Sequence, residues 1–182
     1  ALPILGGQKE LAFMTEYGFN WMGPNNNYGW GNPSYEKVRD YLVGIVGELS
    51  QMGFDEILLY NAGFPTEGKI DTIKKDENYD TAKFAQIIGD FYDQAAQAAE
   101  QGGAKLSVVT TADTIQTGSD AKSGQTLDNL SKLSRVWLTD AGNSDLNALE
   151  QKLAEAGMKE RPLGVFTNNL DAGQTVCQAV LK

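Results

Sequence analysis

GFDEILLYNAGFPTEG, from Gly53 to Gly68, is the stretch of sequence that decides the fold. A run of apolar residues is followed at once by a polar loop with Gly and Pro, which is typical of a buried strand ending at a sheet edge. The preceding segment, 33–52, repeats apolar residues at helical spacing. Asn32 with Pro33 is a start signal and Gly53 a stop signal. We therefore expect an amphipathic helix over 33–52 and a strand over 54–62.

The same alternation of apolar runs and helical patterns continues in both directions. Further strands are predicted at 10–17 (ELAFMTEY), 104–113 (AKLSVVTTAD), 135–142 (RVWLTDAG) and 161–169 (RPLGVFTNN). Further helices are predicted after Asp80, within 123–134, from Ser144, and over 172–182 (AGQTVCQAVLK). The last helix would bury Cys177, the single cysteine.

Strict alternation of strands and helices predicts an α/β fold with a parallel sheet of about five strands. Two architectures fit: a TIM-barrel-like or partial barrel, and a five-stranded doubly wound, flavodoxin-like fold. No repeat or linker divides the chain, so we expect one domain over 1–182. Because the chain begins with Ala, that domain can be a fragment of a larger protein.

Composition excludes several classes of function. The formal net charge of −9, without a cluster of Lys and Arg, argues against nucleic-acid binding. No apolar stretch has the roughly 18 to 20 residues needed to span a bilayer. There is no histidine, which excludes His-based metal sites and Ser/His/Asp or Cys/His catalysis within the chain. We predict no cofactor and no metal.

Polar residues follow each predicted strand, and in either architecture the carboxyl ends of the strands form the ligand-binding edge. The acids there are Glu16, Asp113 and Asp140, accompanied by Tyr60, Asn61 and Asn168. Paired carboxylates suit the hydrolysis of a glycosidic bond, because one acts as acid and the other as nucleophile or base. The alternative is that each acid caps a helix or braces a loop.

The segment 15–35 is a long loop in which aromatic residues, among them Trp21 and Trp30, alternate with Asn and Gly. Flat rings beside amide donors suit the apolar face and hydroxyl rim of a sugar. The alternative is a lid whose rings fold back over the end of the sheet.

The segment WGNPSYEKVRDYLVGIVGELSQMGFDEILLYNAGFPTEG, Trp30 to Gly68, resembles a bacterial family of uncharacterised proteins described as putative glycoside hydrolases with a TIM-barrel fold. Shared elements are the Trp-x-Asn-Pro start, the Arg-Asp-Tyr triplet, the Gly-Phe-Asp-Glu-Ile strand entry and the Phe-Pro-Thr-Glu-Gly loop. The resemblance implies a carbohydrate partner and a place outside the cell or in its envelope. In much of that family an acid and an Arg stand where this chain has Tyr60 and Gly63.

Three functions remain open from the sequence. The first is carbohydrate hydrolysis by Asp113, Asp140 and Glu16. The second is a carbohydrate-binding module without catalysis, with Trp21, Trp30, Tyr60, Asn61 and Asn168 as contacts. The third is a flavodoxin-like structural or interaction domain. A partial barrel would also leave open sheet edges, to be covered by a homo-oligomer or a further domain.

Overall fold

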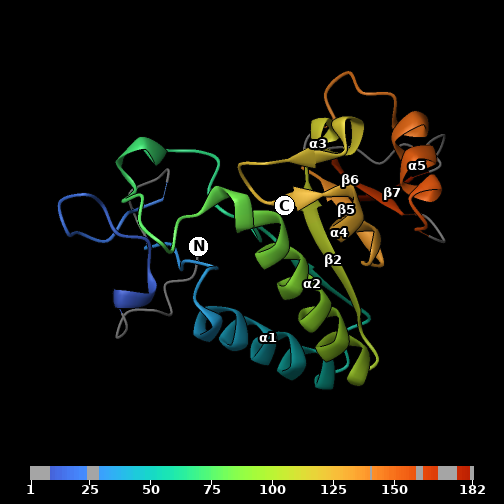
Figure 1. Cartoon of the computed structure of the whole chain (residues 1–182). Helices are drawn as coiled ribbons and strands as arrows, with labels where there is room; N and C mark the ends of the chain where they lie inside the picture. The colour runs from blue at the N-terminus through green and yellow to red at the C-terminus, as the bar shows by residue number, and fades with distance from the viewer. Residues whose placement is uncertain (1–8, 24–28, 140, 159–161, 168–175, 181–182) are drawn as a thin grey trace.

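A computed structural model of the chain describes residues 9–23, 29–139, 141–158, 162–167 and 176–180 (Figure 1). Its centre is a parallel five-stranded sheet in the order β1 (Glu56–Leu59), β2 (Lys105–Thr110), β5 (Arg135–Leu138), β6 (Leu163–Thr167) and β7 (Cys177–Val180). The helices are α1 (Glu36–Gln51), α2 (Phe84–Gln101), α3 (Ala112–Thr117), α4 (Leu127–Ser131) and α5 (Leu146–Glu155). A small antiparallel hairpin joins β3 (Ser119–Asp120) to β4 (Gln125–Thr126). Short 3-10 helices lie at Lys9–Leu11, Ile70–Thr72 and Thr81–Lys83.

The order of the strands decides between the two predicted architectures. Each strand of the sheet pairs with the next one along the chain, without a reversal. A flavodoxin-like sheet has the order 2-1-3-4-5, so that alternative is wrong. Right-handed connections that all step in the same direction place their helices on the same face, as in a (β/α)8 barrel. The fold is therefore a five-stranded part of a TIM-barrel-like arrangement.

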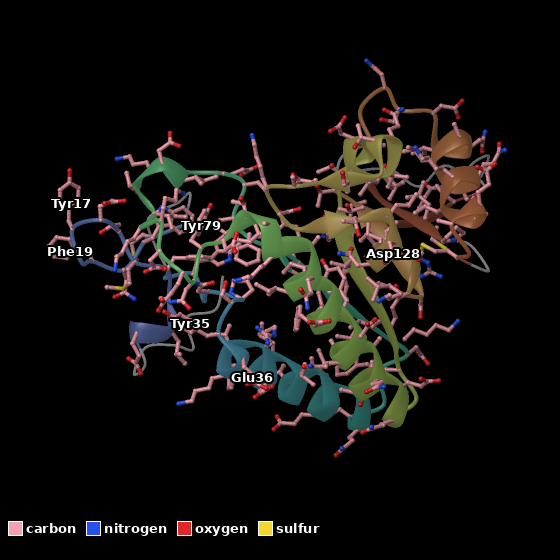
Figure 2. All side chains as sticks on the ribbon, viewed as in Figure 1. Tyr17, Phe19, Tyr35, Glu36, Tyr79 and Asp128 are labelled. Carbon is pink, nitrogen blue, oxygen red and sulfur yellow. The ribbon has the colours of Figure 1, made fainter. Side chains whose placement is uncertain are left out.

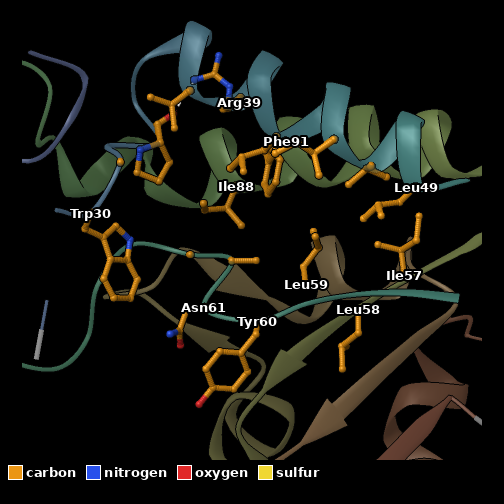
Figure 3. A pocket seen from close by; sticks show the side chains of 18 residues that line it. Trp30, Arg39, Leu49, Ile57, Leu58, Leu59, Tyr60, Asn61, Ile88 and Phe91 are labelled. Carbon is orange, nitrogen blue, oxygen red and sulfur yellow. Dashed lines mark hydrogen bonds between the residues drawn. The ribbon is translucent and has the colours of Figure 1, made fainter. Parts of the chain in front are cut away.

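One face of the sheet packs against helices and forms the core. In Figure 3, Ile57 and Leu59 extend from β1 toward α1 and α2, whereas Leu58 and Tyr60 extend to the opposite side. By register, Leu106, Val136 and Leu163 share the face of Ile57, and all three are almost fully buried. α1 and α2 pack against each other, and the Ser50 hydroxyl of α1 donates to the carbonyl of Ala98 in α2 at 3.1 Å.

The opposite face carries a polar and aromatic cluster. The Glu56 carboxylate accepts hydrogen bonds from Ser107 (2.5 Å), from the indole N–H of Trp137 (3.0 Å) and from Arg135 (2.5 Å). The Trp137 ring stacks on Phe166 with centroids 5.0 Å apart. On this face, adjacent strands thus surround one carboxylate with donors beside a pair of stacked rings.

The predicted strand at 10–17 is wrong. This segment makes only isolated bridges, Ala12 with Gly31, Met14 with Asn20 and Thr15 with Ile73, and it is not part of the main sheet. Phe13 instead packs among the rings of Trp21, Phe64 and Tyr79. Aromatic packing therefore draws the segment away from β1 and leaves β1 at the edge of the sheet.

The helix predicted at 172–182 is wrong over Cys177–Val180, and residues 172–175 and 181–182 lie outside the described residues. Cys177–Val180 forms β7, which pairs in parallel with β6, and Cys177 is half-buried instead of enclosed in a helix face. The other predicted helices and strands are confirmed with shifts at their ends, but Ala112–Thr117, predicted partly as the end of a strand and partly as a loop, forms α3, and the β3–β4 hairpin was not predicted. Asp80 accepts a hydrogen bond from the Ala82 amide ahead of α2, and Asp145 rather than Ser144 caps α5.

Within the described residues, no helix is long and apolar enough to cross a membrane. Those residues also contain no group of three or more Cys, Asp or Glu side chains that could hold a metal ion.

Candidate functional site

A cavity of about 330 Å³ lies where β1, β2 and β5 end. We call it the strand-end pocket. Its walls come from the loop after β1, from the residues that follow β2 and β5, and from the β3–β4 hairpin. The lining residues are Trp30, Tyr60, Asn61, Ala62, Gly63, Phe64, Thr66, Glu67, Val109, Thr110, Thr111, Asp120, Ser123, Gln125 and Thr139.

Two carboxylates line the strand-end pocket, and they come from different parts of the chain. Glu67 stands exposed on the Phe-Pro-Thr-Glu-Gly loop after β1. Asp120 stands half-buried at the end of β3, where its Oδ1 accepts a hydrogen bond from the Lys122 amide at 3.0 Å. The pocket therefore has one acid on a loop and one held by a hairpin.

A buried hydrogen-bond network forms the floor of the pocket. Gln125 donates to the Tyr92 hydroxyl at 2.9 Å and to the Val109 carbonyl at 3.0 Å, and its Oε1 accepts from Thr110 at 2.9 Å. The Tyr92 hydroxyl in turn donates to the Ala62 carbonyl at 2.8 Å. Burial raises the pKa of Tyr92 well above its usual value, so this hydroxyl stays protonated. The network ties α2, the loop after β1, and the end of β2 to the hairpin.

Gly63 sits where the loop after β1 and the hairpin come closest. The Phe64 amide donates to the Ser123 carbonyl at 2.9 Å. A Cβ atom at position 63 would lie 2.8 Å from that same carbonyl oxygen. The hairpin thus occupies the space that a side chain at position 63 would need, such as the Arg of the resembling family.

Tyr60 and Asn61 lie at the end of β1, beside Trp30 (Figure 3). Tyr60 is 62% exposed, so its ring is available for contact. Asn61 has a φ of 54°, in the left-handed region that few non-glycine residues adopt. Backbone conformations of this kind are enriched at ligand-binding sites. Three residues predicted from the sequence as ligand contacts therefore line the same pocket.

Two of the three predicted acids, Glu16 and Asp113, lie outside the lining of the strand-end pocket. Glu16 is exposed and does not line the pocket; its neighbours Tyr17 and Phe19 lie at the outer tip of the N-terminal region (Figure 2). Asp113 is exposed in the first turn of α3, outside the pocket lining, although Thr111 is part of it. Asp140 lies outside the described residues.

Two of the predicted carbohydrate contacts also fall elsewhere. The Trp21 ring is only 2% exposed, and its indole N–H donates to the Lys69 carbonyl at 3.0 Å, so Trp21 is part of the core. Asn168 lies outside the described residues. Sequence reasoning missed Glu67 and Asp120 as candidate acids. Glu67 stands within the loop motif on which the resemblance depends, and that was the available signal.

Comparison with known proteins points to one family. A family model described as "Putative glycosyl hydrolase domain" matches residues 4–136. No curated protein matches the chain.

Solved structures similar to the chain include catalytic domain 2 of the Group II chitinase of Ostrinia furnacalis (16% identity, TM-score 0.46, 74% of this chain and 39% of that chain). They also include a GH20 exo-β-N-acetylglucosaminidase of Vibrio harveyi (8%, 0.46, 88% and 21%). A third is the spore cortex-lytic enzyme SleL of Bacillus megaterium (11%, 0.46, 79% and 34%). The chain spans less than two fifths of the length of each of these proteins.

Proposed function

The chain belongs to the family described as a putative glycosyl hydrolase domain, and from this membership we propose that its strand-end pocket binds a carbohydrate and hydrolyses a glycosidic bond. One observation carries the proposal: two carboxylates, Glu67 and Asp120, line a single polar cavity together with Trp30 and Tyr60. Tyr60 is 62% exposed and offers a flat surface to the apolar face of a sugar ring, whereas Trp30 is only 9% exposed and packs against Trp21. Paired acids supply the chemistry of hydrolysis.

We assign the two acids different roles from the way in which each is held. Asp120 is fixed by the Lys122 amide and belongs to a hairpin bonded to the loop after β1, so it suits the nucleophile or base. Glu67 is exposed on its loop and suits the acid that protonates the departing sugar oxygen. We keep Asp140 as a third candidate, because the preceding residue, Thr139, lines the pocket.

A second candidate function is carbohydrate binding without hydrolysis. Tyr60 and Gly63 stand where much of the resembling family has an acid and an Arg. The close approach of the Ser123 carbonyl leaves no room for a side chain at position 63. In this alternative, Tyr60, Asn61 and Trp30 contact the sugar and the two acids only accept hydrogen bonds from its hydroxyl groups.

An array of glycans, followed by product analysis of every glycan that binds, separates the two candidates. Release of reducing sugar from a bound glycan would support hydrolysis. Binding to a glycan that stays intact on long incubation would refute hydrolysis and support the binding module. An absence of binding to every glycan, with no release of sugar, would refute both.

We further propose that additional protein covers the sheet beside β1. Among the residues that the structure describes, β1 has a neighbour only on its β2 side, and exposed edges of parallel sheets are normally covered. The cover is a second copy of the chain or a further domain. Sedimentation analysis of the purified chain, compared with that of a longer form of the protein, tests this point.

A further inference from the structure

Two aromatic side chains on one turn of the N-terminal region are exposed to solvent. Tyr17 is 83% exposed and Phe19 is 72% exposed, and Figure 2 shows both at the outer tip of that region. They belong to the aromatic segment 15–35, whose predicted sugar contacts, Trp21 and Trp30, are largely buried. A ligand that covered Tyr17 and Phe19 would remove a large apolar surface from water.

The turn that carries the two rings is held by its own hydrogen bonds. The Thr15 amide donates to the Phe19 carbonyl at 2.7 Å, and the Gly18 amide donates to the Thr15 carbonyl at 2.9 Å. The Thr15 hydroxyl donates to the same Phe19 carbonyl at 3.1 Å and accepts from the Phe19 amide at 3.2 Å. Gly18 has a φ of 80°, which glycine adopts without strain. The backbone under both rings is therefore fixed, which lowers the entropy lost when a ligand binds.

Packed rings connect this turn to the wall of the strand-end pocket. The Trp21 amide, just after the turn, donates to the Phe13 carbonyl at 2.7 Å, and the two rings meet edge-on with centroids 6.4 Å apart. Trp21 in turn packs against Trp30, with centroids 6.0 Å apart, and Trp30 lines the pocket. The turn and the pocket thus belong to one packed unit.

The size and charge of the exposed surface indicate which partner it fits. Two aromatic side chains offer about 300–500 Å², whereas a stable protein–protein interface buries about 800 Å² on each partner. The segment 15–20, TEYGFN, has no Lys or Arg, so it lacks the cations that an anionic membrane attracts. A sugar ring needs only a flat apolar surface with polar groups beside it, and Glu16 and Asn20 flank the two rings in the chain.

We propose that Tyr17 and Phe19 form a second carbohydrate-binding site, separate from the strand-end pocket. Its ligand is a polysaccharide of glucose-type units, glucose or N-acetylglucosamine, whose C–H groups give each unit an apolar face. Two residues of chain span at most about 7 Å, so the two side chains contact the same unit or neighbouring units of one polymer. The inference shares with the proposed function only the carbohydrate partner, because the turn holds the polymer without the two pocket acids.

Retention of the chain on an insoluble polysaccharide tests the inference. The probes are regenerated cellulose and regenerated chitin, and the protein left in solution is measured against the amount of polysaccharide. Tyr17→Ala and Phe19→Ala should each weaken retention by about 2-fold to 10-fold, and the double variant by about 4-fold to 100-fold. Tyr17→Phe keeps the ring and should retain most of the binding. No retention of the original chain on either probe, or equal retention of the double variant, would overturn the inference.

Met52 and Phe54 provide a matched control. They are exposed apolar side chains on either side of Gly53, whose φ of 87° is close to that of Gly18. They precede β1 and so lie at its opposite end from the strand-end pocket. Replacing both by Ala should leave retention unchanged. An equal loss in the two double variants would mean that any exposed apolar pair adheres to the polysaccharide, and it would contradict the assignment to Tyr17 and Phe19.

Other partners have separate readouts. The double variant of Tyr17 and Phe19 is compared with the original chain by sedimentation and by binding to vesicles of phosphatidylcholine and phosphatidylserine. A change in either measurement, with retention on cellulose and chitin unaltered, would assign the rings to a protein or a membrane and overturn the inference. Both positions are exposed, so circular dichroism should show an intact fold in every variant.

The outcomes also separate the inference from the proposed function. Hydrolysis of short soluble glycosides should be the same in the double variant and in the original chain, since neither ring lines the pocket. Retention that depends on the two rings, in a chain that hydrolyses no glycan, would support the second site and refute hydrolysis. Hydrolysis in a chain whose retention ignores the two rings would do the reverse.

Discussion

The carbonyl oxygen of Ser123 lies 2.8 Å from the position that a Cβ atom at Gly63 would occupy. A contact this short to a backbone atom requires the hairpin or the loop to move, and the Phe64 amide is bonded to the same carbonyl. We predict that Gly63→Ala lowers the free energy of unfolding by about 1–3 kcal/mol, as overpacking typically does. Urea denaturation followed by circular dichroism measures the change.

Gly44 provides the matched control, because it lies inside α1 and a Cβ there meets nothing within 4 Å. Gly44→Ala should stabilise the domain by about 0.5–1 kcal/mol. Equal effects at positions 44 and 63 would show that the hairpin does not restrict position 63.

Glu67→Gln and Asp120→Asn should each lower the rate of glycoside hydrolysis by about 100-fold to 10,000-fold, the range typical of general acid–base groups. Binding of the intact glycan should change much less. Asp90→Asn, an exposed position on α2 outside the pocket lining, is the control. Activity that survives both pocket substitutions but is lost in Asp113→Asn or Glu16→Gln would return the chemistry to the acids predicted from the sequence.

Tyr92→Phe should destabilise the domain by about 1–3 kcal/mol at neutral pH, because Gln125 and the Ala62 carbonyl each lose a buried partner. Denaturant titrations at pH 7, of the original chain and of the variant, measure this difference.

The same substitution tests the alkaline limit of stability. Burial raises the pKa of Tyr92 in the folded state, so above the usual tyrosine pKa of about 10 the unfolded chain releases a proton that the folded chain retains. The contribution of the raised Tyr92 pKa to the free energy of unfolding is therefore complete below about pH 10. As the pH rises further, it is lost by up to about 1.4 kcal/mol per pH unit. Tyr92→Phe should flatten this decline, and an unchanged slope would mean that Tyr92 ionises readily in the folded chain.

Arg135→Met should destabilise the sheet by about 1–3 kcal/mol, since it leaves the Glu56 carboxylate with neutral donors alone. Lys132→Met is the comparison, because its pair with Asp93 is exposed and should contribute less than about 1 kcal/mol. Thermal unfolding of the two variants under the same conditions compares the two losses of stability. A larger loss at Lys132 would contradict the structural role of the Glu56 cluster.

The sequence predicts α1 and the strands β1, β2, β5 and β6 because local signals agree there. Asn32, Pro33 and Gly53 bound a strong helical period, and each of these strands is an apolar run between turn residues. Cys177–Val180 shows the limit of such signals. A short apolar run fits a helix or a strand equally well, and pairing with β6 decides the outcome.

The sequence predicts where the candidate site lies, but it does not predict all the residues that line it. Parallel strands bring their carboxyl ends to one edge, which is why Tyr60 and Asn61, both predicted from the sequence to lie at that edge, line the strand-end pocket. Asp120 follows no strand of the main sheet. The β3–β4 hairpin carries it to the pocket, held by the bond from the Phe64 amide to Ser123 and by the bonds from Gln125 of β4 to Tyr92 and Val109. Trp21 has the residue type expected of a sugar contact, yet ring packing encloses it.

Trp30 gives the molecule an optical reporter of its own. Although it is only 9% exposed, it lines the strand-end pocket, whereas Trp21 is 2% exposed and outside the pocket lining, and Trp137 donates to Glu56 on the other face of the sheet. The chain has no fourth tryptophan. With Trp21 and Trp137 replaced by Phe, the remaining indole emission would come from the wall of the strand-end pocket alone. A sugar that displaces water beside the ring would shift that emission, so occupancy of the pocket could be followed without a label.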